Sequence, residues 1–193
     1  MQDYLAAIYD LAGSGQPVIG ARLAKHMNVS APTVTEAIQR MVRGDYVKVG
    51  RGKELTLTRR GLEVAEVMAR RHRLLERWLT DILGLNWTDA HEEAHRLEHA
   101  ISPRVELRLA ELLGMPSTCP HGNPIPGMAR VPHVEPFPLA QAQEGMTVIV
   151  ERITEVAPWA GTITASADGQ NIALGLPAAA KIWVYRPVPG GAA

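Results

Sequence analysis

The apolar residues of the first forty-five positions recur at helical spacing in three short stretches. Residues 3–11 and 19–27 each fit one amphipathic helix, and a segment rich in glycine separates them. A third helix is predicted to begin after Ser30, a good N-cap, with Pro32 in its first turn, where the missing N–H costs nothing. Helix, short turn and capped helix is the spacing of a helix-turn-helix.

Two short runs with β-type residues follow the third predicted helix. Residues 46–50 and 54–57 are rich in Val, Leu and Thr, and they flank Arg51-Gly52-Lys53. The pattern predicts a hairpin with a basic tip. Such a wing would let Arg51 and Lys53 contact a phosphate backbone beside the groove that the third helix occupies. A hairpin after three helices also occurs in modules that bind only protein.

Helical periodicity then returns for about fifty residues. The pattern predicts helices over residues 59–83, capped by Thr58, over 88–101, capped by Thr88, and over 103–113, begun by Ser102-Pro103. Residues 115–138 are rich in proline and glycine and are typical of a linker. Beyond them, a small β module is predicted, with strands over residues 147–150, 161–164 and 181–185.

Composition excludes several classes of protein. Hydrophobic residues make up 46% of the chain, which is enough for a packed core. No apolar run approaches the roughly 18 residues that a membrane helix needs, and no signal-peptide pattern opens the chain. Cys119 is the single cysteine, so no intrachain disulfide can form. We therefore expect a cytoplasmic protein.

The formal net charge of zero conceals an uneven distribution. Between Val18 and Arg77 there are 13 Lys+Arg against 6 Asp+Glu, a net of +7, and the rest of the chain carries 7 basic and 14 acidic residues, a net of −7. Phosphate neutralisation by Lys and Arg dominates non-specific nucleic-acid binding, so a basic block of this size indicates a polyanion partner. An ordinary solvated basic surface is the alternative. The basic hairpin tip favours duplex DNA.

The predicted third helix supplies most of the candidate DNA contacts. Its early turns are expected to present polar side chains to bases or phosphates, and neighbouring arginines are expected to supply positive charge. The candidate DNA-binding residues are Arg22, Ser30, Pro32, Thr33, Thr35, Glu36, Gln39, Arg40, Arg43, Arg51 and Lys53.

Four of the seven histidines fall between positions 72 and 99. At 100° per residue, His91, His95, Glu98 and His99 fall within an arc of about 100° that borders the apolar face of their helix. On the preceding helix a further histidine, His72, stands four residues before Glu76 and so shares its face. Imidazole and carboxylate side chains that converge beside the buried face of a helix can bind a divalent transition metal, and such a site needs no thiolate ligand. A charged surface helix with half-exposed histidines is the alternative.

The segment His91-Glu92-Glu93-Ala94-His95 also matches H-E-x-x-H, the signature of zinc peptidases in which the Glu is the general base. In a peptidase Glu92 would face the metal-bound water, but the periodicity places it at the edge of the solvent side. No glycine-spaced third ligand follows. We keep a metallopeptidase as the least favoured alternative, and we expect no enzyme.

The joint pattern of a winged helix-turn-helix, a helix bearing H-x-x-x-E and a helix bearing H-x-x-x-H-x-x-E-H resembles the diphtheria toxin repressor and manganese transport regulator family of metal-activated repressors. The match covers residues 1 to about 127. The sequence runs that carry it are Arg71-His72-Arg73-Leu74-Leu75-Glu76-Arg77, Thr80-Asp81-Ile82-Leu83-Gly84-Leu85, Glu98-His99 and Gly122-Asn123-Pro124-Ile125-Pro126-Gly127.

The resemblance implies a mainly α fold with a small β part. Residues 1–60 would form the winged helix-turn-helix, and residues 61–127 a helical metal-binding and dimerisation domain. A proline-rich linker would span 128–138, and a shortened SH3-like β module 139–187.

The resemblance also implies two metal sites. A regulatory site would take Asp3 from the first helix together with His95, Glu98 and His99, and an ancillary site would use His72, Glu76 and His91. Cys119 and His121 are similar to a linker pair that supplies ligands in some manganese-type relatives, and a plain linker pair is the alternative. Family members usually carry Cys or Glu at the position of His95, so this residue is a departure.

The resemblance implies a homodimeric, metal-activated transcriptional repressor of metal-ion homeostasis that binds a palindromic DNA operator. Its activator would be Mn²⁺ or Fe²⁺, with Zn²⁺ or Co²⁺ possible in vitro, and it would have no membrane partner. The main alternative is a metal-independent winged-helix regulator in which the His/Glu cluster is structural.

Overall fold

The computed structural model describes residues 1–13, 17–128, 136–153, 162–167, 170–175, 179 and 181–187. The chain forms two compact units, Met1–Gly114 and Met115–Ala193, and we describe each by itself. The division into four domains stays our proposal. Among the described residues, no helix combines the length and the apolar character that crossing a bilayer requires.

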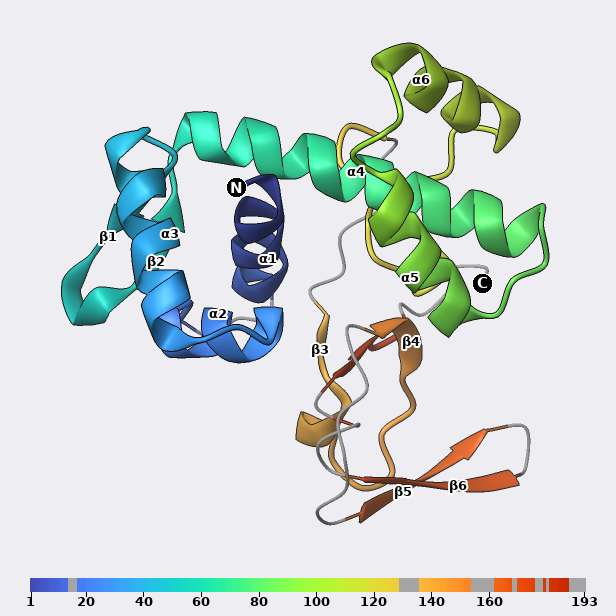
Figure 1. Cartoon of the computed structure of the whole chain (residues 1–193). Coiled ribbons are helices and arrows are strands. Elements are labelled where there is room, and N and C mark those ends of the chain that lie inside the picture. Colours follow the sequence, from blue (N-terminus) through green and yellow to red (C-terminus); the bar gives the residue numbers. More distant parts are fainter. Residues whose placement is uncertain are drawn as a thin grey trace. The chain divides into compact units, whose positions relative to one another are not determined.

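The first unit begins with three helices and a hairpin (Figure 1). The helices are α1 (Gln2–Ala12), α2 (Gly20–Met27) and α3 (Ala31–Arg43). Ser30 caps α3, because its side chain accepts a hydrogen bond from the backbone N–H of Thr33. The hairpin pairs β1 (Val47–Val49) with β2 (Leu55–Leu57) in antiparallel register, across a short 3₁₀ turn at Arg51–Lys53. The winged helix-turn-helix predicted from the sequence is therefore present.

A core of aliphatic side chains joins these elements. Leu5 and Ile8 of α1, Leu23 of α2, and Val34 and Met41 of α3 are all within 1% of full burial. Each lies on the apolar stripe of its helix, so the periodicity that predicts the helices also predicts this core.

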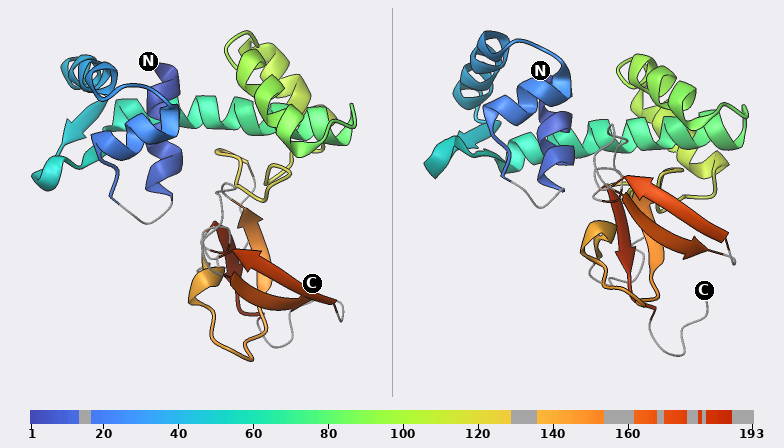
Figure 2. Two further views of the ribbon diagram at one scale, coloured as in Figure 1. Left: turned by 60° about the horizontal axis from the view of Figure 1, so that its bottom comes forward. Right: turned by 90° about the horizontal axis from the view of Figure 1, so that it is seen from below.

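The long helix α4 (Arg59–Asp81) connects the winged part of the first unit, which consists of α1–α3 and the β1–β2 hairpin, to the helices that follow it in the same unit (Figure 2). Its N-cap is Thr58, whose side chain accepts a hydrogen bond from Gly61 N and donates one to Asp45 O at 2.6 Å. Gly61 packs so closely on the turn before the hairpin that a Cβ there would lie 2.0 Å from Tyr46 O. The wing is thus fixed directly to the start of α4.

Two shorter helices, α5 (Trp87–Leu97) and α6 (Pro103–Leu112), pack on α4. The N-cap of α5 is Asn86, which accepts from Asp89 N, and not Thr88 as the sequence predicts. The helix also ends at Leu97 and not at residue 101, so Glu98 and His99 lie in the turn that follows it. Ser102 caps α6 as predicted.

A buried carboxylate holds α6 against α4. Glu106 is 8% exposed, and its two oxygens lie 2.5 Å from Arg70 Nε and 2.9 Å from Arg71 Nε. Two guanidinium groups on one carboxylate compensate the cost of burying its charge. These two ion pairs therefore fix α6 on the same helix, α4, against which α5 packs.

The second unit is a small β module. Strand β7 (Ile182–Tyr185) lies between β3 (Phe137–Pro138) and β4 (Ile149–Ile153), and all three pair in antiparallel fashion. A 3₁₀ turn (Leu139–Gln141) follows β3. Two further strands, β5 (Thr162–Ala167) and β6 (Gln170–Gly175), form a separate hairpin. The three predicted strands are present, whereas β3 and β6 escape the sequence analysis. Most of the predicted linker over 128–138 lies outside the described residues.

Candidate metal centre and nucleic-acid interface

Three of the predicted ligands meet between α4 and α5. His72 Nε2 lies 3.1 Å from Glu76 Oε1 and 3.0 Å from His91 Nδ1, and His91 Nδ1 lies 2.9 Å from the same carboxylate oxygen. Glu76 is only 3% exposed. The side chains that the resemblance assigns to the ancillary site are therefore neighbours, with one ligand atom of each within 4.8 Å of the others.

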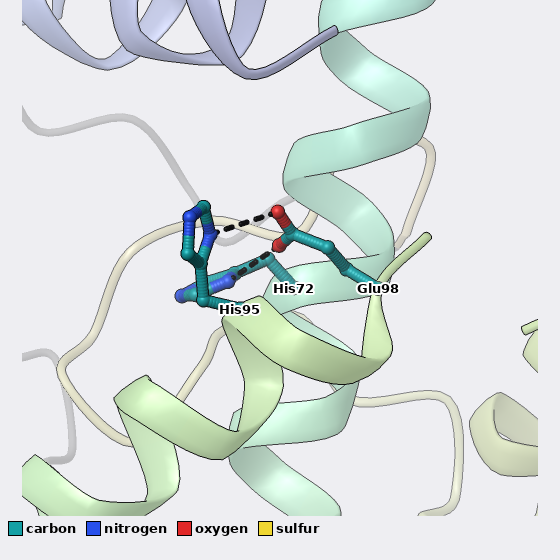
Figure 3. Close-up of side chains that lie close together, drawn as sticks. All are labelled: His72, His95 and Glu98. Atoms are coloured by element: carbon teal, nitrogen blue, oxygen red, sulfur yellow. Dashed lines mark hydrogen bonds and ion pairs between the residues drawn. The ribbon is translucent and has the colours of Figure 1, made fainter. Parts of the chain in front are cut away.

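Glu98 connects this cluster to a second one. Its side chain is 5% exposed; Oε2 lies 2.7 Å from His72 Nδ1, and Oε1 lies 3.0 Å from His95 Nδ1 (Figure 3). The same Oε1 lies 3.6 Å from His99 Nε2. One buried carboxylate therefore faces three imidazoles, which come from α4, from α5 and from the turn after α5.

Asp3 reaches this cluster from the first turn of α1. Its Oδ1 lies 2.6 Å from His99 Nε2, and among the described residues Asp3, Glu98 and His99 form one group of potential ligands. His95 groups instead with His72 and Glu98. Residues far apart in the chain thus converge, although the four residues of the predicted regulatory site do not form a single cluster.

The protonation of His72 reflects its two carboxylate neighbours. Burial disfavours the charged imidazole, but the hydrogen bonds to Glu76 and Glu98 outweigh it and raise the pKa of His72 to about 10. A protonated His72 then pairs with both carboxylates. Ligation of a cation through a nitrogen of His72 would release this proton.

The donor set fits a divalent transition metal. Imidazole nitrogens and carboxylate oxygens are ligands that Mn²⁺, Fe²⁺ and Zn²⁺ accept. Asp3 Oδ1 is buried. It lies close to His99 Nε2, but among the described residues it has no partner with the geometry of a hydrogen bond. Buried polar atoms rarely stay without such a partner, and a cation beside this oxygen would satisfy it.

Cys119 and His121 belong to the second unit. Cys119 is 2% exposed, and its Sγ lies 3.8 Å from His121 Nδ1. The two predicted linker ligands are therefore neighbours in space as well as in sequence.

The candidate DNA-contacting residues lie mostly on the outside of the winged part. Val34, Ala37 and Met41 bury one face of α3, and the opposite face carries exposed candidates: Pro32, Thr33, Thr35, Glu36, Gln39, Arg40 and Arg43. At the wing, Arg51 and Lys53 are exposed as well. Arg22 of α2 is half-buried, and its guanidinium donates to Pro17 O at 2.7 Å.

Local hydrogen bonds fix the hydroxyl groups at the start of α3. Ser30 Oγ lies 2.7 Å from Thr33 Oγ1, and Thr35 Oγ1 donates to Ala31 O at 2.9 Å. The Ser30 side chain therefore serves the helix cap in this structure, while Glu36 and Arg40 form an exposed pair at 4.0 Å. These bonds hold the first turn of α3 in a defined conformation, with its polar side chains turned to solvent.

Sequence reasoning missed two features near the metal centre. Gln2 Oε1 lies 3.2 Å from His99 Nδ1, and Arg73 binds Asp10 of α1 at 2.8 Å. The contact of Gln2 could not be predicted, because a single amide side chain near the start of a helix carries no distinguishing sequence pattern. The second pair could have been suspected, since both residues are charged and stand on predicted helices, but the register between helices is not visible in the sequence.

A winged helix-turn-helix joined to a buried cluster of histidines and carboxylates defines a class of protein: DNA-binding regulators that respond to a divalent metal. Residues 1–55 match the family model of the iron dependent repressor N-terminal DNA binding domain. Residues 58–127 match the model of the iron dependent repressor metal binding and dimerisation domain. Together the two models span well over half of the chain.

Individual proteins agree with these models. The chain is 39% identical over 163 residues to the iron-dependent repressor IdeR of Mycobacterium tuberculosis, covering 79% of this chain and 70% of that protein. It is 38% identical over 160 residues to the diphtheria toxin repressor of Corynebacterium jeikeium, covering 80% and 67%. A solved manganese-dependent transcriptional repressor in complex with manganese matches with a TM-score of 0.85 and 36% identity, over 96% of this chain and 99% of that one.

The chain therefore belongs to the iron-dependent repressor family of metal-dependent transcriptional repressors. The family resemblance and the mainly α fold class predicted from the sequence are confirmed. This is a family of repressors and not of enzymes, so the H-E-x-x-H match is misleading. Consistent with this, Glu92 is exposed and lies 4.0 Å from Arg96.

Proposed function

We propose that this protein represses transcription when a divalent cation binds between α1, α4 and α5. The observation that carries the proposal is the approach of Asp3, at the very start of the chain, to His99 at 2.6 Å. A cation held by both would connect α1, the first helix of the winged helix-turn-helix, with the turn that follows α5. When bound, the cation supplies the positive charge and the coordination that hold these ligands together.

For the regulatory site we propose Asp3, His95, Glu98 and His99 as ligands. The observed groups support a centre on Glu98, with Asp3 and His99 on one side of it. His95 would turn from its contact with Oε1 of Glu98 to the same ion, and its side chain is 62% exposed, so a rotation meets little resistance.

For the ancillary site we propose His72, Glu76 and His91, which already converge. From the family resemblance we further propose Cys119 and His121 as a ligand pair. As activators we propose Mn²⁺ or Fe²⁺, the metals for which its relatives are named, with Zn²⁺ and Co²⁺ as substitutes in vitro. Affinity alone would favour Co²⁺ and Zn²⁺ over Mn²⁺ and Fe²⁺, in the Irving–Williams order, so the activating metal in the cell depends on site geometry and metal availability.

The chain's own residues would transmit the effect to DNA. Asp3 is on the same helix as Leu5 and Ile8, which pack in the core of the winged part. If the cation fixes α1, it would favour one relative position of the two winged helix-turn-helix units in a homodimer. That position would match the half-sites of a palindromic operator, which are about one helical turn apart. The exposed face of α3 would read bases, and Arg51 and Lys53 would bind phosphates. We propose that the protein acts in the cytoplasm, where such DNA is found.

Fluorescence anisotropy on a promoter duplex tests this function. We expect no specific binding in EDTA and restored binding after addition of Mn²⁺ or Fe²⁺. In Asp3→Ala, addition of metal should no longer change DNA binding, and the variant should keep its fold, because the Asp3 side chain is 38% exposed and is outside the core. Glu92→Gln, an exposed change on α5, is the matched control and should behave like the wild type. Equal binding with and without chelator would instead identify a metal-independent regulator.

A further inference from the structure

The segment around Cys119 is a built turn and not an extended linker. Cys119 N donates to Asn123 O at 2.9 Å, and Gly122 N donates to Cys119 O at 2.9 Å. Flanking this turn, Thr118 and Pro124 form an isolated antiparallel bridge. These bonds place the Cys119 thiol and the His121 ring on one short, closed loop.

This turn is fixed to strand β4 of the C-terminal module. The backbone N–H of Ile153 donates to His121 O at 2.9 Å. Gly122 lies so close to the strand that a Cβ would stand 2.1 Å from Glu151 O and 2.9 Å from Arg152 Cα. Its φ of +85° is in the region that favours glycine. The docked conformation therefore requires glycine at position 122, both for its backbone angle and for its contact with β4.

The two donor atoms already stand at a distance that one cation can bridge. Cys119 Sγ and His121 Nδ1 are 3.8 Å apart. In a tetrahedral site with metal–sulfur and metal–nitrogen bonds of roughly 2.3 and 2.0 Å, the sulfur and nitrogen are about 3.5 Å apart. Asn123 Nδ2 lies 3.8 Å from the same sulfur and orients it. The pair thus needs little movement to bind a single ion.

We propose that the C-terminal β module holds the Cys119–His121 pair in ligand geometry, with Gly122 as the positioning residue that lets the turn dock on β4. This inference rests on the proposed function, in which these two residues bind the activating metal. It gives the module a role that its strand pattern does not reveal. β4 in turn is fixed by its pairing with β7, whose Val184 is fully buried.

Titration of the full-length protein with Co²⁺ tests the inference, because a thiolate bound to Co²⁺ gives a charge-transfer absorption in the near ultraviolet. Gly122→Ala is compared with Gly145→Ala, a matched control: Gly145 also has a positive φ, of +78°, but a Cβ there meets nothing within 4 Å. We expect Gly122→Ala to weaken the Co²⁺ affinity read from this band by about tenfold or more, the usual effect of losing a group that orients a ligand. Gly145→Ala should titrate like the wild type.

Two further results separate the possible failures. Because Cys119 is the single cysteine, Cys119→Ser gives the background without a thiolate band, and absence of the band in the wild type would overturn the ligand assignment itself. A band lost in Cys119→Ser but equal in Gly122→Ala and Gly145→Ala would overturn the positioning role while leaving the ligands in place. If Gly122→Ala does not fold, hydrogen exchange of the Ile153 amide in the wild type decides: it should slow on addition of Co²⁺, and an unchanged rate contradicts the inference.

Discussion

Replacing Glu98 by glutamine tests the two clusters at once, because this carboxylate faces both. The change keeps the size of the side chain and removes its charge. In the metal-free protein it weakens the hydrogen bond between Glu98 Oε2 and His72 Nδ1, at 2.7 Å. Since a hydrogen bond to a charged group contributes about 1.5–3 kcal/mol and the amide still accepts one, we expect a loss of about 1–2 kcal/mol in the free energy of unfolding. For a chain of this size that lowers the Tm by roughly 2–8 °C.

The effect on metal binding should be larger. A ligand that binds only the folded state stabilises it in proportion to the logarithm of its affinity, so a 100-fold loss of affinity removes about 2.7 kcal/mol of that stabilisation. We therefore expect Glu98→Gln to show a lower Tm in EDTA and a clearly smaller rise in Tm than the wild type on addition of Mn²⁺, with the remaining rise due to the ancillary site. Thermal unfolding followed by circular dichroism measures both. Glu93→Gln is the matched control, since Glu93 is on α5, shortly before Glu98 in the chain, and forms an exposed pair with Arg96. The same Mn²⁺-induced rise in Glu98→Gln as in the wild type would refute the assignment of Glu98 as a ligand.

Other substitutions test the remaining elements. Gly61→Ala should lower the free energy of unfolding by about 3 kcal/mol, the upper end of usual overpacking costs, because its Cβ would meet Tyr46 O. Urea unfolding measures this, and Gly50→Ala, whose Cβ would have its nearest contact at 3.8 Å, should lose far less. Asn86→Ala should lower stability by about 1 kcal/mol through loss of the α5 cap, whereas an equal or larger effect of Thr88→Ala would contradict the observed cap. Arg51→Ala should weaken metal-activated DNA binding uniformly across sequences and reduce the slope of log affinity against log salt by about 1, and an unchanged slope would exclude a phosphate contact.

Local signals in the sequence predict most of the first unit. Ser30, Thr58 and Ser102 all cap the helices expected of them, since a hydroxyl before an apolar-periodic run has few other roles. At α5 the sequence offers Asn86 and Thr88 two residues apart, and composition cannot choose between two good caps. The same limit applies at its other end, where apolar spacing continues past Leu97 although the helix does not.

The metal centre is predictable within a helix but not between helices. His72 and Glu76 stand four apart, so their proximity follows from helix geometry. The bond from His72 to Glu98 depends on how α4 and α5 cross, which periodicity does not specify. For the same reason the sequence could not show that Glu98 faces His72 as well as His95. The approach of Asp3 to His99 was expected only from the family resemblance.

Thr58 has a consequence for motion as well as for stability. Its hydroxyl joins the last turn before the hairpin to the first turn of α4, and its backbone N–H donates to Tyr46 O at 2.9 Å. We therefore expect the hairpin and α4, which carries His72, to move together as one rigid body. A rotation of the end of α4 near His72 would then also move the basic tip at Arg51 and Lys53.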